Sequence, residues 1–170
     1  DGDADRLGVI NEKGEYISTL EVFSLICLYK LKILKEKGAI VKSITMTNMI
    51  DKIGDIYKVQ VYETPVGFKH LGKVMMEQKA LIAGEESGGY AFKGNIPERD
   101  GILSGLIFLE MLVQMNKTAS ELIEMLFDEV GSHVYQRIDL EIEENEKESL
   151  NNKIKYWAPT NIGASIVKEK

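Results

Sequence analysis

Short helical and strand-like segments alternate along residues 18–130 of this 170-residue chain, and this alternation restricts the fold more than any other feature. The segments with helical patterns are about 20–37, 49–56, 69–78, 101–115 and 118–130, and those with strand patterns are about 39–46, 57–63 and 80–83. Helices and strands that alternate at short intervals are typical of a layered α/β unit. We therefore expect a three-layer α/β/α domain with a mixed, mostly parallel sheet and a C-terminal extension.

The helix predicted for residues 101–115 has apolar positions at helical spacing. The positions that share one face are Ile102, Leu106, Leu109 and Leu112.

The last forty residues differ from the rest of the chain in composition and in sequence pattern. A strand is predicted for 133–142, an acidic run follows at 143–148, and a short helix is predicted for 150–157. We interpret this region as a linker and part of a further domain, and the alternative is a C-terminal extension of the same domain.

Composition excludes several functional classes. The net charge of −6 and the pI near 5.1 disfavour nucleic acid as a partner. Charged residues interrupt each apolar stretch before it could span a bilayer, so we expect no membrane partner. Cys27 is the only cysteine, which excludes an intrachain disulfide. We expect a cytoplasmic protein that acts on a small molecule.

Three carboxylates occupy alternate positions at the start of the chain, at Asp1, Asp3 and Asp5, and Arg6 follows at once. Carboxylates are hard oxygen ligands, and this spacing allows them to converge on one divalent cation. A guanidinium matches the oxygens of a phosphate two at a time. This acidic loop therefore indicates a metal site beside an anionic group, and the alternative is a solvated acidic stretch.

An EF-hand calcium loop is a second alternative for the acidic loop, because Glu12 also stands at a ligand position. Arg6 replaces the glycine that this loop requires, and Gly8 replaces its usual aliphatic residue. Both replacements count against the EF-hand.

Residues 84–89, G-E-E-S-G-G, follow a predicted strand, where ligands of α/β sheets commonly bind. Glu85 and Ser87 stand two positions apart, and a carboxylate and a hydroxyl on one side of a loop can bind adjacent hydroxyls of a sugar. The alternative is a polar surface turn. We call this segment the sugar loop.

Residues 64–69, T-P-V-G-F-K, form a turn that places Lys69 at the start of a helix. The helix dipole does not favour a cation there, so Lys69 is a candidate for function. A desolvated lysine near a phosphate or hydroxyl could transfer a proton, and the alternative is a solvated lysine. We call this segment the lysine turn.

Taken in order, these three motifs and the E-R-D-G segment at 98–101 resemble the α-D-phosphohexomutase family, the phosphoglucomutases and phosphomannomutases. The resemblance implies that Asp1, Asp3 and Asp5 coordinate Mg²⁺ and that Arg6 approaches the phosphoryl group or the sugar phosphate.

The resemblance also implies that Lys69 is a candidate acid or base at the reacting hydroxyl and that Glu85 and Ser87 bind sugar hydroxyls. Such enzymes interconvert hexose 1-phosphate and hexose 6-phosphate through a phosphoserine and a bisphosphorylated sugar. The G-E-E-S-G-G form resembles phosphoglucomutases more closely, which favours glucose phosphate as the substrate.

In terms of that family, residues 1–15 correspond to the end of the second domain with the magnesium loop. Residues 16–130 correspond to the third, sugar-binding domain, and 131–170 to a linker and the start of a truncated fourth domain. The chain has no phosphoserine loop of the T-A-S-H-N-P type and no R-x-S-G-T loop. We therefore expect a fragment that is inactive without the remaining domains of its parent chain. The alternative is a non-catalytic calcium- or carbohydrate-binding module.

Overall fold

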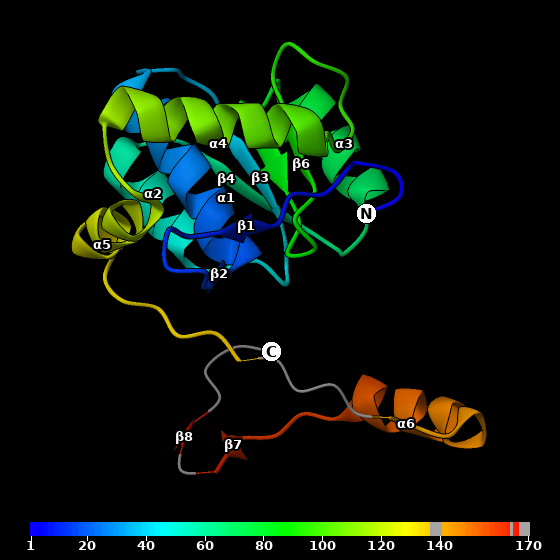
Figure 1. Cartoon of the computed structure of the whole chain (residues 1–170). Helices are drawn as coiled ribbons and strands as arrows, with labels where there is room; N and C mark the ends of the chain where they lie inside the picture. The colour runs from blue at the N-terminus through cyan, green and yellow to red at the C-terminus, as the bar shows by residue number, and fades with distance from the viewer. Residues whose placement is uncertain (137–140, 164, 167–170) are drawn as a thin grey trace. The chain divides into compact units, whose positions relative to one another are not determined.

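The computed structural model describes residues 1–136, 141–163 and 165–166 (Figure 1). The chain divides into two compact units, Asp1–His133 and Val134–Lys170, which are described separately below. None of the helices in the described ranges has the length and apolar character needed to cross a membrane.

A four-stranded sheet in the order β4-β3-β5-β6 forms the centre of the first unit. The strands are β3 (Ile40–Ser43), β4 (Val61–Thr64), β5 (Ile82–Gly84) and β6 (Tyr90–Phe92). β3 runs parallel to both β4 and β5, and β6 pairs antiparallel with β5. The prediction of a mixed, mostly parallel sheet is confirmed.

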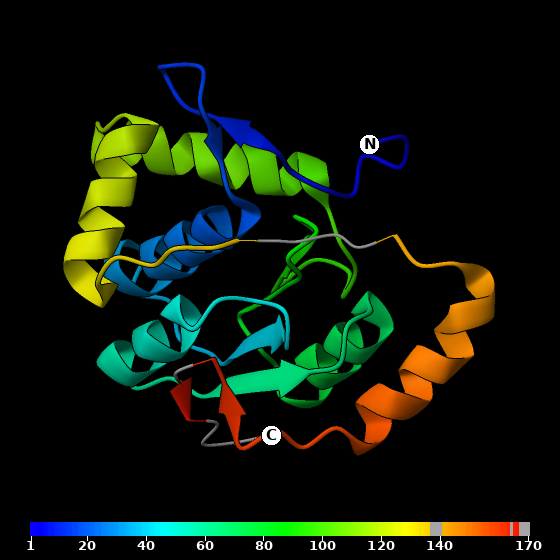
Figure 2. The same cartoon turned by 90° about the horizontal axis from the view of Figure 1, so that it is seen from below.

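Helices cover both faces of this sheet, because successive residues of a strand point to opposite sides. Ile40 belongs to the larger apolar cluster, with α1 (Thr19–Leu28), whereas Val41 belongs to the smaller cluster, with α3 (Phe68–Glu77). Figure 2 shows α1 in blue and α3 in green on opposite sides of the strands. The three-layer α/β/α architecture is therefore confirmed.

The remaining helices of this unit all contribute to the larger apolar cluster. They are the π-helix η1 (Tyr29–Ile33), α2 (Met49–Tyr57), α4 (Gly101–Met115) and α5 (Ala119–Val130). α1 lies in the middle of this layer, and eight of its ten residues are buried. An almost entirely apolar helix is stable only when other elements enclose it.

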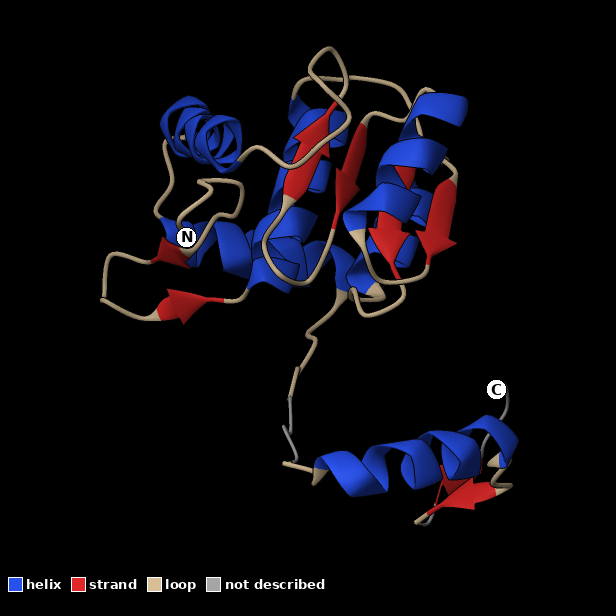
Figure 3. Ribbon diagram, turned by 90° about the vertical axis from the view of Figure 1, so that its right-hand side faces the viewer, coloured by secondary structure: helices blue, strands red, loops and turns tan. Residues whose placement is uncertain are grey.

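A two-stranded hairpin connects the acidic loop to α1 and pairs with no strand of the main sheet (Figure 3). It consists of β1 (Val9–Ile10) and β2 (Tyr16–Ile17), which pair antiparallel. No sequence pattern predicts this pair, because strands of two residues are too short for a period to be recognised.

In the first unit, two predicted boundaries are wrong by four residues. The helix predicted for 20–37 divides into α1 and η1 and ends at Ile33, and Lys35 then has a φ of 56°. The strand predicted for 57–63 begins only at Val61, because Tyr57 is the last residue of α2. In both places a lysine in the left-handed region follows the helix, a role that glycine fills more often.

The apolar face of α4 that the sequence pattern identifies is mostly exposed. Ile102, Leu106 and Leu109 are 68%, 59% and 56% exposed. The helix instead buries Phe108 and Met111 in the larger cluster. Residues 101–115 are apolar on nearly every side, so the sequence pattern could not select the face that packs.

The second unit consists of α6 (Glu144–Tyr156) and a hairpin of β7 (Asn161–Ile162) and β8 (Ser165–Ile166). The helix predicted to begin at Leu150 begins earlier, since the acidic run forms its first turn, where the helix dipole favours carboxylates. The strand predicted for 133–142 lies partly outside the described residues, and its described ends form no strand. The assignment of these residues to a fourth domain stays a prediction.

The packing of α4 can be tested with two truncations. Met111→Ala removes a fully buried side chain and should lower the free energy of unfolding by about 2–4 kcal/mol. Leu106→Ala removes an exposed side chain and should cost less than about 1 kcal/mol. Urea unfolding of the two variants measures both values, and an equal loss in both would contradict the observed orientation of α4.

Candidate functional site

The three parallel strands end at the same edge of the sheet, at Ser43, Thr64 and Gly84. The lysine turn leaves this edge after β4, and the sugar loop leaves it after β5. In open α/β sheets, ligands bind outside the carboxyl ends of the strands. The fold therefore brings two of the three predicted motifs to the edge where a ligand would bind.

The sugar loop is a tight turn between the antiparallel strands β5 and β6. The Glu85 amide donates to the carbonyl oxygen of Gly89 at 3.0 Å, and the Gly88 amide donates to the carbonyl oxygen of Glu85 at 3.1 Å. Gly88 has a φ of +91°, and a Cβ there would lie 2.7 Å from the carbonyl oxygen of Leu7. Conformation and space therefore both require glycine at this position.

Glu85 connects the sugar loop to the lysine turn. Its side chain is buried, with 5% of the residue exposed, and its Oε1 accepts a hydrogen bond of 2.8 Å from the amide of Gly67. Gly67 precedes the first turn of α3, where a carboxylate is favoured by the helix dipole. Oε2 has no hydrogen-bond partner among the residues that the structure describes.

Lys69 and Ser87 are both exposed. Lys69 lies in the first turn of α3 and forms no ion pair with a described residue. The structure therefore does not desolvate Lys69, whose turn is anchored by the hydrogen bond between the Gly67 amide and the buried Glu85 carboxylate.

The acidic loop contacts both the sugar loop and the start of α4. The Leu7 amide donates to the carbonyl oxygen of Gly88 at 2.9 Å, and the Gly101 amide donates to that of Ala4 at 3.1 Å. A Cβ on Gly101 would lie 2.7 Å from the Ala4 oxygen, so only glycine allows this close approach. All three motifs of the sequence analysis therefore belong to one region.

The three aspartates do not converge on one point. Arg6 Nε donates to Asp1 Oδ2 and lies 3.8 Å from Asp5 Oδ1, whereas Asp3 is exposed. Over the described ranges, no three acidic, histidine or cysteine side chains are grouped so that they could hold a metal ion. The Arg6 guanidinium offsets part of the negative charge of Asp1 and Asp5.

One atom nevertheless fits a cation. Asp5 Oδ1 is buried and accepts no hydrogen bond, and such an orphaned carboxylate oxygen is unfavourable unless a positive group reaches it. Mg²⁺ prefers carboxylate oxygens and needs only one or two of them. The donor set of the acidic loop therefore suits this ion. The EF-hand does not fit, because the strand β1 follows the loop in place of a helix.

Arg99 is the residue of this region to which the sequence analysis gave no role. Its Nη2 lies 2.9 Å from Asp5 Oδ2, and its guanidinium lies 5.8 Å from the centre of the Phe68 ring. The E-R-D-G segment at 98–101 was the sequence signal for this region. It could not reveal the role of Arg99, because the residues that Arg99 contacts are far from it in sequence.

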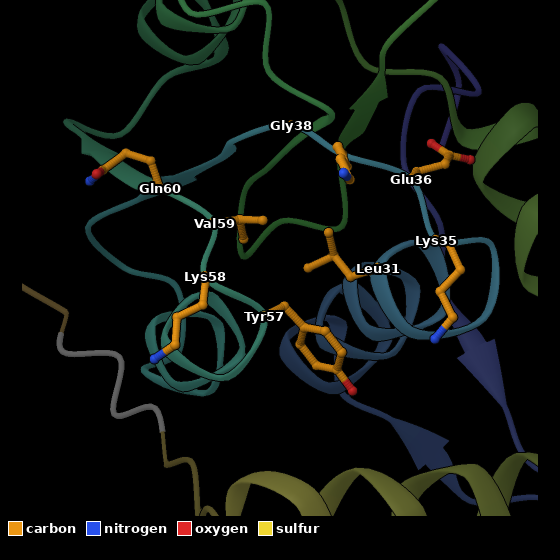
Figure 4. A pocket seen from close by; sticks show the side chains of 9 residues that line it. Leu31, Lys35, Glu36, Gly38, Tyr57, Lys58, Val59 and Gln60 are labelled. Carbon is orange, nitrogen blue, oxygen red and sulfur yellow. The ribbon is translucent and has the colours of Figure 1, made fainter.

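A separate cavity of about 550 Å³ lies at the other end of the strands, before β3 and β4. Figure 4 shows Leu31, Tyr57 and Val59 near its centre, with Lys35 and Lys58 on either side. Both lysines follow the end of a helix, where the dipole favours cations, so the cavity needs no ligand to explain its charge.

Groups with shifted pKa values lie outside the candidate site. Burial raises the pKa of the Cys27 thiol, so this cysteine is no nucleophile at neutral pH. Hydrogen bonds from Lys32 and Tyr57 lower the pKa of Glu129. Cys27 lies on α1 and Glu129 on α5, outside the three motifs.

Comparison with known proteins identifies the family of the chain. Residues 21–130 match the family described as "Phosphoglucomutase/phosphomannomutase, alpha/beta/alpha domain III". A phosphoglucosamine mutase of Nautilia profundicola is 32% identical over 152 residues, which cover 89% of this chain and 33% of the relative. A phosphoglucomutase/phosphomannomutase of Thermococcus kodakarensis is 33% identical over 128 residues, which cover 74% of this chain and 27% of the relative.

Among solved structures, a putative phosphomannomutase from Thermus thermophilus superposes with a TM-score of 0.74 at 34% identity. The match covers 77% of this chain and 30% of that chain. The chain belongs to the phosphoglucomutase/phosphomannomutase family and contains its domain III. It spans about a third or less of the length of these relatives.

The contact between Glu85 and Gly67 gives a test of the site geometry. Glu85→Ala leaves the Gly67 amide without its acceptor and should cost about 1–3 kcal/mol of unfolding free energy. Glu85→Gln keeps an oxygen that can accept this bond and should cost less. Urea unfolding, with hydrogen exchange at the Gly67 amide, checks both, and equal effects of the two variants would contradict the assigned contact.

Proposed function

We propose that this chain is part of a phosphohexomutase that interconverts hexose 1-phosphate and hexose 6-phosphate. The observation that carries the proposal is the meeting of the acidic loop, the lysine turn and the sugar loop at the carboxyl edge of the sheet. Direct hydrogen bonds, from Leu7 to Gly88 and from Gly67 to Glu85, join the three motifs. The remaining domains of the parent chain complete the enzyme.

The proposed substrate is glucose phosphate. Relatives of this chain include a phosphoglucosamine mutase and a phosphoglucomutase/phosphomannomutase, so the family accommodates more than one sugar. The G-E-E-S-G-G form of the sugar loop favours glucose. Glu85 Oε2 and the exposed Ser87 hydroxyl bind adjacent sugar hydroxyls, which holds the ring in place while either phosphate faces the acidic loop.

The acidic loop holds Mg²⁺ through Asp1, Asp3 and Asp5 in this proposal. When bound, the ion neutralises negative charge on the transferring phosphoryl group. Arg6, now paired with Asp1, exchanges this partner for phosphate oxygens, which its planar donors match.

Lys69 contributes a proton or a positive charge at the reacting hydroxyl. As an ammonium it would donate a proton to the sugar oxygen from which a phosphoryl group departs, and its positive charge would stabilise the negative charge that develops on that oxygen. Glu85 supports this role by fixing the turn that carries Lys69.

A phosphoserine on another domain of the parent gives its phosphoryl group to the sugar phosphate and recovers the other one from the bisphosphorylated sugar. This chain has no T-A-S-H-N-P segment that could supply the serine. A cytoplasmic site of action is part of the proposal, and the acidic composition is compatible with it.

The metal assignment is tested by Asp3→Ala in the parent chain. Loss of a ligand should lower Mg²⁺-dependent turnover by about 100-fold or more, with domain III still folded. Asp55→Ala is the matched control, because Asp55 is exposed on α2. A coupled assay of glucose 6-phosphate formation measures the rate, and full activity of Asp3→Ala would show that the metal assignment is wrong.

Because the phosphoserine is assigned to another domain of the parent, we expect the purified 170-residue chain to be inactive. Glucose 1-phosphate, glucose 1,6-bisphosphate and Mg²⁺ should yield no glucose 6-phosphate above the rate without protein. Conversion that rises in proportion to the concentration of the chain would contradict this part of the proposal.

A further inference from the structure

Arg99 contacts all three motifs of the candidate site. Its guanidinium pairs with Asp5 of the acidic loop at 2.9 Å and lies over the ring of Phe68 in the lysine turn at 5.8 Å. Its aliphatic part lies against Gly89 of the sugar loop. No sequence pattern relates these three neighbours to Arg99, so the folded chain alone reveals the arrangement.

The Arg99 side chain packs so closely against Gly89 that it leaves no room for a side chain at position 89. A Cβ on Gly89 would overlap with Arg99 Cδ and would lie 2.7 Å from its Cγ. Unlike Gly88, Gly89 has no φ in the left-handed region, so its backbone would accept another residue. The arginine side chain is therefore the reason that this position must lack a side chain.

The pairing with Arg99 also determines which oxygen of Asp5 can meet a cation. Oδ2 forms the ion pair with the guanidinium, whereas Oδ1 is buried and accepts no hydrogen bond, with Arg6 Nε 3.8 Å away. Partners that hold the second atom of a metal-binding side chain orient that side chain toward the ion. Arg99 is such a partner of Asp5, because it pairs with the second oxygen, Oδ2.

We propose that Arg99 is a positioning residue of the site. It holds Asp5 with Oδ1 directed to a divalent cation, and it fixes the acidic loop to the sugar loop and the lysine turn. The cation part rests on the proposed function, whereas the positioning of the loops is a property of this chain alone. The competing explanation is a surface ion pair with no effect on the loops.

Hydrogen exchange of the 170-residue chain separates these explanations. The reporters are the amides of Leu7 and Gly101, which bond to Gly88 and Ala4. Arg99→Met keeps the aliphatic stem but loses the ion pair, and exchange at both reporters should become roughly fivefold to tenfold faster. The amide of Ile40, in the core of the sheet, should not change. Unchanged reporters would overturn the proposal, as would an equal acceleration at Ile40.

Further variants test whether the effect passes through Arg99. Gly89→Ala displaces the arginine and should accelerate the same reporters, and the double variant with Arg99→Met should add nothing further. Arg99→Lys restores the charge and should recover part of the protection. Gly105→Ala is the control, because its Cβ would make only an ordinary contact of 3.7 Å with Leu7. Additive effects of Gly89→Ala and Arg99→Met would overturn the proposed coupling.

A magnesium titration, followed at the Asp5 amide signal, tests the cation part separately. The apparent affinity should fall about tenfold in Arg99→Met. Equal affinities, or no response of the wild-type chain at millimolar Mg²⁺, would overturn the orientation of Asp5 toward a cation. The exchange result involves neither metal nor sugar, so it decides the positioning of the loops whether or not the proposed function holds.

Discussion

The shared edge at which β3, β4 and β5 end is the constraint on which the candidate site depends. Parallel strands must end on the same side, so the segments that follow them become neighbours although they are distant in sequence. The sugar loop and the lysine turn are neighbours for this reason. Glu85 of the sugar loop joins the two segments by accepting a hydrogen bond from the Gly67 amide. The acidic loop reaches the same edge through its hydrogen bonds to Gly88 and Gly101.

Much of this fold could be predicted from local sequence signals. The helices predicted to start near residues 20 and 118 begin at capping boxes formed by Ser18 and Thr118, and the helix at 101–115 has the predicted bounds. Local signals failed where tertiary contacts decide. α4 exposes Leu106 and buries Met111, because the helix offers apolar residues on both sides and only its neighbours select one.

The sequence also identified the three motifs of the site, but it did not show how they are connected. Glu85 was expected to face a sugar, and the structure shows that one of its oxygens is committed to the Gly67 amide. The aspartates were expected to converge, and Arg6 instead pairs with Asp1. Such pairings depend on side-chain positions in the folded domain, which spacing alone does not determine.

The central claim is that the three motifs form one binding site for a hexose phosphate. The most direct measurement is a titration of the ¹⁵N-labelled chain with millimolar glucose 1-phosphate, followed by the amide signals of each residue. The account predicts that Arg6, Lys69 and Ser87 shift together with one apparent affinity. Shifts confined to the cavity near Lys35 and Lys58, or separate affinities for the three motifs, would contradict it.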